Sequence, residues 1–491
     1  MARDPQAALV ALNRFGLGAR GGGAGDFASA ASDPRDFVKA ELNRRNVALL
    51  DVPGLQGTPA LAQAAFDYQA EVKQQRKAAA QSLAMVSDGK PADPAKPAST
   101  AGTIMRPLST AVGKPSPRHS PNVIQQTYRA EALARVQRAT MAESGFAERL
   151  VAFWSNHFCI SANKGQLARI WAGAFEREAI RPHVLGRFSD MLLAVEQHPA
   201  MLFYLDNQRS VGPNSRAGRN RKRGLNENLA RELMELHTLG VGNGYTQQDV
   251  TTLAAILTGW TFAGRAGRLG EPATFIFNAN AHEPGPQKLL SKVYDDTGVT
   301  QGETALADIA RRPATAKFIA HKFAAHFVAD DPPPALVARL ETSFQRTDGD
   351  LKSLAMTLVD SDEAWAAPMT KIRTPNEFLV ATGRIMGRIP EGPGRYLGAL
   401  NLLGEPLWTP PGPNGFADTN AMWASPENMK LRLDVASQIS SRIADTLNPN
   451  DVLEACAGEA TSQDTRKAIA RAETREQALA LLLMSPEFQR R

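Results

Sequence analysis

The residues best suited to chemistry lie in one leucine-rich segment, 225–240. At 100° per residue its five leucines form a single apolar stripe, and Glu232 falls inside that stripe. Asn228 lies one turn before Glu232, and Glu235 lies nearly one turn after it. Burying an unpaired carboxylate is costly. Glu232 therefore either holds an arginine in the core or belongs to a site where paired carboxylates share a proton or bind a metal.

A second polar side chain points inward from the helical segment 147–158. It is His157, whose predicted face also carries Leu150, Phe153 and Trp154. A histidine on an apolar face is usually a satisfied core residue, but two inward polar groups, His157 and Glu232, are expected to meet. A histidine against a buried carboxylate is a general-base arrangement or half of a metal site. The candidate catalytic residues are therefore His157, Asn228, Glu232 and Glu235, and the candidate ligands of a divalent metal are His157, Glu232 and Glu235.

Three loops offer further polar and aromatic side chains. His282 and Lys288 flank a Pro-Gly-Pro turn, Trp408 lies in a Pro/Gly-rich loop over 405–418, and Tyr204 and Asp206 precede a basic loop. Irregular loops of this kind either line a binding surface or cover a core. We take His282 as a further catalytic candidate. The substrate-binding candidates are Trp408, Tyr204, Asp206 and Lys288.

The elements that must position these residues are almost all helices. Apolar residues recur with a helical period in ten segments: 124–142, 145–158, 166–179, 227–239, 247–257, 316–328, 351–360, 376–386, 428–446 and 475–484. Thr246 with Asp249, and Thr374 with Glu377, have the spacing of capping boxes. One hairpin is expected, between 273–278 and 287–293. The predicted fold class is all-α, a large multi-helix domain with at most one small β-hairpin.

Composition divides the chain into three parts. Residues 1–76 form an N-terminal helical part of the main domain, 77–122 are a Pro/Ala/Ser-rich mobile insert, and 123–491 complete the all-α domain. The loop over 209–224 carries only positive charges, which is typical of a solvated loop and less often of an anion-binding one. It lacks the aromatic residues that nucleic-acid grooves interleave with basic ones.

Length and charge exclude several classes of protein. The chain has 491 residues, a formal charge of +6, and no apolar run long enough to span a membrane. The charge is too small to indicate nucleic-acid binding by itself. The two cysteines, Cys159 and Cys456, rule out a disulfide framework, and buried free thiols are expected. The first twenty residues lack an export signal, which predicts a cytoplasmic protein unless a partner carries it to the periplasm.

Successive blocks of the sequence are distinctive: HPAMLFYLDNQ, NENLARELMELHTLGVGNGYTQQDVTTLAAILTGWTF, HEPGPQK, HKFAAHFV, TPNEF, GEPLWTPPGPNGF and SPEFQ. Together they resemble the bacterial family called domain of unknown function 1800 (DUF1800), and the resemblance covers nearly the whole chain. The chain departs from the family in its longer basic loop, in the 77–122 insert, and in reading HEPGPQK where relatives tend to read HDxGxK. The resemblance implies a partner from the DUF1501 family, which is similar to alkaline phosphatases and sulfatases and often carries a twin-arginine signal.

Three functions follow as expectations. The first is a hydrolase with a carboxylate and histidine site, with or without a metal, because such groups activate water. The second is a non-catalytic escort for a secreted phosphatase- or sulfatase-like partner. The third is a metal-dependent oxidoreductase, which is weakened because the chain lacks the Glu-x-x-His pattern of ferritin-like sites. HExxH, GxSxG and P-loop motifs are also absent from the sequence.

Overall fold

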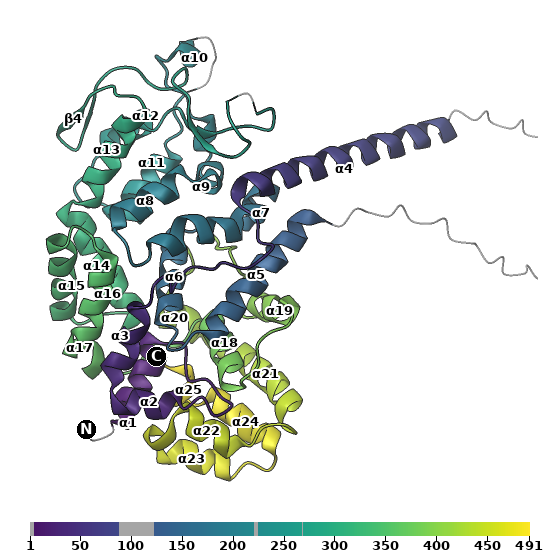
Figure 1. The fold of residues 1–491 in the computed structure, drawn as a ribbon, viewed down its shortest axis with the longest axis vertical. Coiled ribbons are helices and arrows are strands. Elements are labelled where there is room, and N and C mark those ends of the chain that lie inside the picture. Colours follow the sequence, from purple (N-terminus) through teal and green to yellow (C-terminus); the bar gives the residue numbers. More distant parts are fainter. Residues whose placement is uncertain (1–3, 88–121, 220–223, 268) are drawn as a thin grey trace, which may run out of the picture.

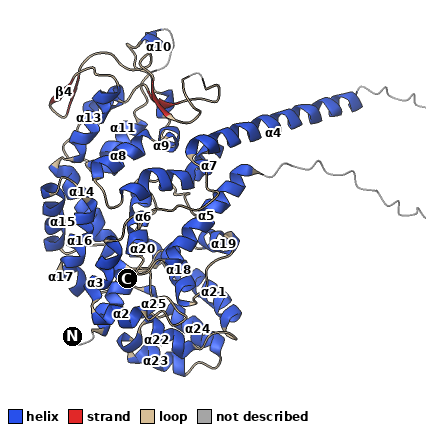
Figure 2. Cartoon of the chain, in the orientation of Figure 1, coloured by secondary structure: helices blue, strands red, loops and turns tan. Residues whose placement is uncertain are grey.

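A computed structural model describes residues 4–87, 122–219, 224–267 and 269–491. Helices make up nearly all of its regular structure, so the predicted all-α class is confirmed (Figure 2). Within these residues no helix is both long enough and apolar enough to cross a membrane.

The helices follow one another along the chain. The first group is α1 (Pro5–Val10), α2 (Asp26–Ser32), α3 (Pro34–Leu42), α4 (Thr58–Ser87), α5 (Val123–Met141), α6 (Phe146–His157), α7 (Gln166–Phe175), α8 (Phe188–Gln197) and α9 (Pro199–Tyr204). The second is α10 (Arg216–Arg219), α11 (Asn228–Glu232), α12 (Gln247–Ile256), α13 (Val299–Ala310), α14 (Pro313–Phe327), α15 (Pro334–Arg346), α16 (Leu351–Asp360) and α17 (Asp362–Ala366). The last is α18 (Pro375–Ile385), α19 (Gly394–Leu402), α20 (Asn420–Trp423), α21 (Pro426–Ile443), α22 (Pro449–Cys456), α23 (Gln463–Ala470), α24 (Arg475–Met484) and α25 (Pro486–Gln489).

Helix α6 lies near the middle of the molecule, with the other helices arranged around it (Figure 1). The N-terminal helices α1 and α2 pack beside the C-terminal part of the chain, where α2 contacts α22. Helices α14 to α17 form one side, and α8 to α13 lie at the end that also carries the strands. Helix α4 projects away from this body and continues to Ser87, into the segment predicted as an insert. The rest of that segment, 88–121, lies outside the described residues.

The strands pair differently from the prediction. Strand β1 (Trp260–Phe262) pairs antiparallel with β2 (Phe275–Phe277), and β3 (Gln287–Leu289) pairs with β4 (Lys292–Tyr294). The predicted hairpin between 273–278 and 287–293 is therefore wrong. Strand β2 pairs with the strand before it and β3 with the strand after it. The sequence pattern marks the strands without marking which strand each one meets.

Local signals explain where the important helices begin. Thr246 and Asp249 cap α12, and Thr374 and Glu377 cap α18, each through reciprocal side-chain and backbone hydrogen bonds. Both predicted capping boxes are therefore confirmed. Pro375 occupies the first turn of α18, where its missing N–H costs nothing. Helix α18 thus holds the side chain of Glu377 against the centre of the molecule.

Among the residues that the structure describes, seven arginine side chains are completely enclosed in the core. They are Arg14, Arg149, Arg181, Arg373, Arg384, Arg432 and Arg491. Several donate hydrogen bonds to backbone carbonyls: Arg384 to Gly18, for instance, at 2.8 Å. A buried guanidinium must be satisfied through most of its five donors. These residues therefore tie loops that are distant in sequence to the same core.

In the described part of the chain, three short π-helical turns interrupt the regular helices. They cover Ala11–Phe15, Glu176–Ile180 and Leu233–Thr238. Each adds a residue to a turn and so rotates the side chains that follow. Arg14, Glu176 and His237 lie in these turns and are buried. The turns thus bring charged and titratable side chains into the core at positions that a regular helix would place elsewhere.

Candidate functional site

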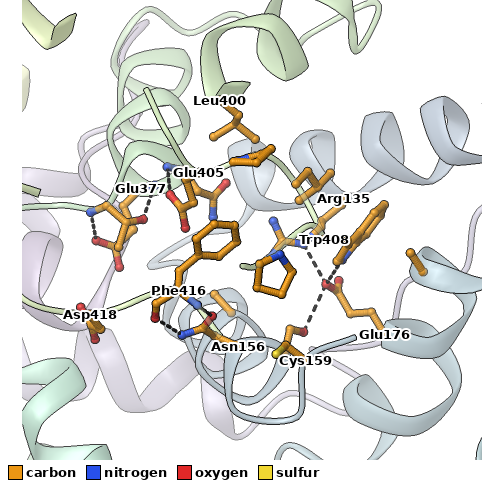
Figure 3. A pocket seen from close by; sticks show the side chains of 18 of the residues that line it. Arg135, Asn156, Cys159, Glu176, Glu377, Leu400, Glu405, Trp408, Phe416 and Asp418 are labelled. Atoms are coloured by element: carbon orange, nitrogen blue, oxygen red, sulfur yellow. Dashed lines mark hydrogen bonds and ion pairs between the residues drawn. The ribbon is translucent and has the colours of Figure 1, made fainter. Parts of the chain in front are cut away.

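A small cavity lies where α6 meets the loop over 405–418. Its volume is about 90 Å³, enough for several water molecules or a small chemical group. Aromatic and aliphatic side chains form much of its wall (Figure 3). Ionisable side chains reach it from α5, the π turn after α7, α14, α18 and the loop, and α6 adds polar ones. Its ionisable side chains are Arg135, Cys159, Glu176, His326, Glu377, Glu405 and Asp418. We call this space the Glu405 cavity.

The loop over 405–418 is fixed in place around Trp408. The Trp408 indole donates a hydrogen bond to Glu176 over 3.2 Å, and its carbonyl accepts one from the Ala162 amide over 2.8 Å. Its backbone has a φ of +49°, which is unusual for a residue other than glycine. Strained backbone of this kind persists only where surrounding contacts hold it. Trp408, predicted to bind substrate, lies in the cavity wall.

Glu176 is a buried carboxylate that stays ionised. Its oxygens lie 2.8 Å from Arg135 Nε and 2.9 Å from the Arg181 guanidinium. Burial alone would raise the pKa of Glu176, but these two cations outweigh that effect and lower the pKa to about 2. Ser155 and Trp408 also donate to it. Its acceptor positions are occupied, so its role is to hold the wall together.

Glu405 has a different environment on the same cavity. Burial raises the pKa of Glu405 to about 7, although the Asn376 amide donates a hydrogen bond to it over 2.7 Å. Nearby Glu377 adds a second negative charge that acts in the same direction as burial. No lysine or arginine of the described chain pairs with Glu405. A carboxyl in this state exchanges a proton near neutral pH.

One hydrogen-bond donor on the cavity wall has no acceptor. The Trp423 side chain is 1% exposed, and its indole N–H lacks a hydrogen-bond partner among the residues described. Buried polar groups are nearly always paired, so an orphaned donor beside a cavity indicates water or a ligand atom there. Trp423 is therefore positioned to donate to a carbonyl or anionic oxygen.

The opposite wall is an ion cluster around Asp418. Its carboxylate lies 2.6 Å from His326 Nδ1, 2.7 Å from the Arg491 guanidinium and 3.3 Å from Lys371 Nζ. Burial disfavours the charge, but the three partners outweigh it and hold the pKa of Asp418 well below its usual range. Glu377 pairs with Arg491 at 2.8 Å in the same cluster. These groups satisfy one another and stabilise the fold.

Cys159 connects the cavity with a second polar cluster. Burial raises the pKa of its thiol to about 12, so it is not a thiolate at neutral pH. Lys322 and Glu232 both act on this thiol electrostatically, from outside the cavity. Both cysteines are free and buried, as predicted.

His157 is buried at the end of α6, but it does not bind Glu232. His157 Nε2 lies 3.0 Å from the carbonyl oxygen of His237, and Nδ1 lies 3.0 Å from Lys322 Nζ. Burial and the neighbouring Lys322 keep the pKa of His157 well below its ordinary value. The expected contact between His157 and Glu232 is therefore not formed.

Glu232 is half-buried rather than enclosed, and Asn228 is exposed. Burial raises the pKa of Glu232, and the charge of Glu235 adds to this. Glu235 itself faces Arg231 at 3.4 Å. The projection at 100° fails at both ends of the stripe. Leu225 precedes the helix, and the π turn over Leu233–Thr238 shifts the phase of the residues after Glu232 and turns His237 inward.

The other candidates lie in separate places. His282 is buried and its Nδ1 lies 2.9 Å from the Thr258 carbonyl, so it fixes the turn that carries it. Lys288 is exposed on β3. Asp206 pairs with Lys164 at 2.5 Å. Tyr204 is buried, and burial raises its pKa, with smaller contributions from Cys159 and Glu232. None of these four side chains lines the Glu405 cavity.

The metal candidates do not converge. No three histidine, cysteine, aspartate or glutamate side chains of the described residues form a group that could hold an ion. His157, Glu232 and Glu235 are included in that statement, because all three lie in described segments. Metal binding by these residues stays a prediction of the sequence.

Sequence reasoning missed the carboxyl groups that make the cavity. Glu405 begins the loop that carries Trp408, and Trp423 follows that loop. No periodic pattern in the sequence marks Glu405 as buried. Its environment comes from the start of α18 and from Arg135 on α5, which are far away in sequence. The pair of His237 and Glu196, 2.7 Å apart and enclosed, was also missed, since the π turn hides it.

One comparison with known proteins identifies a family, and none adds an activity. A family model described as a protein of unknown function (DUF1800) matches residues 10–490. No curated protein and no solved structure matches the chain. The match spans essentially the whole sequence, and it therefore places the chain in the DUF1800 family.

Proposed function

We propose that this protein is a hydrolase whose reaction takes place in the Glu405 cavity, with Glu405 transferring the proton. One observation carries this proposal: Glu405 is the carboxyl group of the cavity wall that has no cationic partner in the described chain. The other three carboxylates of the wall, Glu176, Glu377 and Asp418, are each paired with arginine. Glu405 is therefore the carboxyl left free to react.

The chemistry follows from the state of each wall residue. With a pKa near 7, Glu405 is available both as carboxylate and as acid at neutral pH. It can take a proton from an attacking water molecule and return that proton to the leaving group. The orphaned indole N–H of Trp423 would donate to the oxygen that gains charge. Cys159 remains a thiol, so the proposed nucleophile is water.

The substrate class can be tested with a panel of chromogenic esters, glycosides and phosphate esters. We expect turnover of at least one class, and we expect Glu405→Gln to lower it by about a hundredfold or more, since a general acid–base group contributes roughly 10²–10⁴. Gln preserves the volume and can still accept from the Asn376 amide, so the variant should remain folded in a thermal melt.

The matched control is Glu427→Gln, which changes an exposed carboxylate at the start of α21. It should keep full activity. The proposal fails if Glu405→Gln remains folded and hydrolyses the substrate as fast as the control does.

A second candidate function is an escort for a DUF1501 partner, with export to the periplasm together with that partner. A groove of about 1120 Å³ between α18, α19 and α21 favours it. Its wall includes Ile389 and Leu402, which are 51% and 48% exposed, large fractions for apolar side chains. Co-purification with such a partner, lost in Leu402→Asp but kept in Glu405→Gln, would select this function over hydrolysis.

The basic loop and the metal-dependent oxidoreductase gain no support. Part of the loop forms the short helix α10, and 220–223 lie outside the described residues. Anion binding there and redox chemistry stay predictions of the sequence.

A further inference from the structure

We propose that Lys322 is a nucleophilic amine that forms an imine with small carbonyl compounds. It lies on α14, outside the set of residues that line the Glu405 cavity, and its neighbours are His157 and Phe318. This activity goes beyond the proposed hydrolysis and does not depend on it.

The amine of Lys322 has an unusual set of contacts. Its Nζ lies 3.0 Å from His157 Nδ1 and 5.3 Å from the centre of the Phe318 ring. Within the described chain no carboxylate lies within ion-pair distance of it. The side chain is half-buried, so part of it remains exposed to solvent. A lysine without a carboxylate partner is held less firmly in its charged form.

The hydrogen-bond pattern determines which atom of His157 accepts. A backbone carbonyl oxygen can only accept, so His157 Nε2, 3.0 Å from the His237 carbonyl, must carry the hydrogen. His157 Nδ1 then presents a lone pair, and Lys322 donates to it. The imidazole is thus fixed as a neutral acceptor directed at the amine.

A buried pair, His237 and Glu196, supports the contact between His157 and Lys322. His237 Nδ1 lies 2.7 Å from Glu196 Oε1, and both side chains are at most 1% exposed. The π turn over Leu233–Thr238 carries His237, so this contact fixes the backbone that orients His157. His157 is therefore a positioning residue for Lys322, and Glu196 acts through His237.

The charges around Lys322 agree with an amine that is partly neutral. Burial lowers the pKa of Lys322 to about 8. Two groups act to raise the pKa of Lys322 again. They are Cys159, which follows α6, and Asp418, in the loop over 405–418. Cys159 is a neutral thiol at pH 7, and Asp418 is already paired with Arg491, Lys371 and His326. Neither group therefore brings the pKa of Lys322 back to that of an ordinary lysine.

The reaction is a condensation without any redox change. The lone pair of Lys322 Nζ forms a bond to the carbonyl carbon, and the carbonyl oxygen becomes a hydroxyl. Nitrogen loses its protons as that hydroxyl leaves as water, so one carbonyl and one amine give one imine and one water.

The test traps the imine on the full chain with glyoxylate and sodium cyanoborohydride at pH 7, followed by peptide mass mapping. Lys317, exposed on the same helix, is the internal control. An amine with a pKa near 8 has on the order of a hundred times more free base at pH 7 than an ordinary lysine. We expect carboxymethylation of Lys322 at least tenfold faster than that of Lys317. Equal or slower modification of Lys322 would overturn the proposal.

Two variants separate reactivity from mere accessibility. His157→Gln should slow trapping at Lys322 at least threefold and leave Lys317 unchanged, whereas a surface effect would change neither. Glu405→Gln should leave trapping unchanged, so hydrolysis and imine formation can fail independently.

If His157→Gln does not fold, a titration of Lys322 in the wild type replaces that variant as the test. After reductive methylation, ¹³C NMR measures the pKa of the Lys322 amine. A midpoint near 8 supports the proposal, and one near 10.5 contradicts it.

Discussion

Replacing Asp418 by Asn is expected to lower the free energy of unfolding by about 3 kcal/mol or more, as removal of one partner from a buried ion pair does. Asp418 faces Arg491 and Lys371, whose side chains are 0% and 1% exposed. Without the Asp418 charge, Arg491 keeps only its ion pair with Glu377, and Lys371 keeps only its ion pair with Asp330. Urea unfolding curves of the variant and of the wild type measure the difference.

The effect of Asp418→Asn should also depend on pH. The pKa of Asp418 is depressed in the folded state, so its charge stabilises the protein above the unfolded value near pH 4 and this stabilisation is lost as pH falls further. The difference in the free energy of unfolding between the variant and the wild type should therefore become smaller below about pH 4. Asp331→Asn, at an exposed position, is the control and should change stability by less than about 0.5 kcal/mol. An equal, small loss in both variants would show that the ion cluster does not hold the fold.

Glu176→Gln is expected to lower the free energy of unfolding by about 3 to 5 kcal/mol, because it removes the charge that the enclosed Arg181 shares with the mostly buried Arg135. Arg135 loses its ion pair altogether, while Arg181 keeps Glu148 at 2.9 Å. The Trp408 indole, bonded to Glu176, should move as a result, and near-ultraviolet circular dichroism records that change together with the melting temperature.

Glu473→Gln is the control for this second change, since Glu473 is exposed near the start of α24. It should leave both the melt and the aromatic signal as in the wild type. A Glu176→Gln protein with an unaltered melting temperature would contradict the assignment of Glu176 to the wall structure.

The helices were predictable because their signals are local. The segments 351–360 and 475–484 coincide with α16 and α24 residue for residue, and both capping boxes are present. Apolar period and caps depend on neighbours three or four positions away, which one sequence displays. Strand pairing depends on distant partners, and there the prediction was wrong.

The candidate site was less predictable for two physical reasons. A projection at a fixed 100° per residue shows neither that the helix begins only at Asn228 nor that a π turn follows Glu232. It therefore placed Glu232 on the buried face, whereas the structure buries His237. The pKa of a carboxyl depends on which charges the fold brings near it. Glu176 and Glu405 are both glutamates, yet Arg135 and Arg181 lower the pKa of the first, and burial raises that of the second. Only the loop around Trp408 marked the place in the sequence.

The measurement that tests the central claim most directly is the infrared titration of Glu405 in the intact protein. The difference spectrum of wild type minus Glu405→Gln isolates the carbonyl band of one protonated carboxyl. We expect that band to be present at pH 6 and to disappear with a midpoint near 7, as burial beside the cavity requires. A midpoint near 4.5, the ordinary value for glutamate, would mean that Glu405 carries a permanent charge, and the proposed proton transfer would be contradicted.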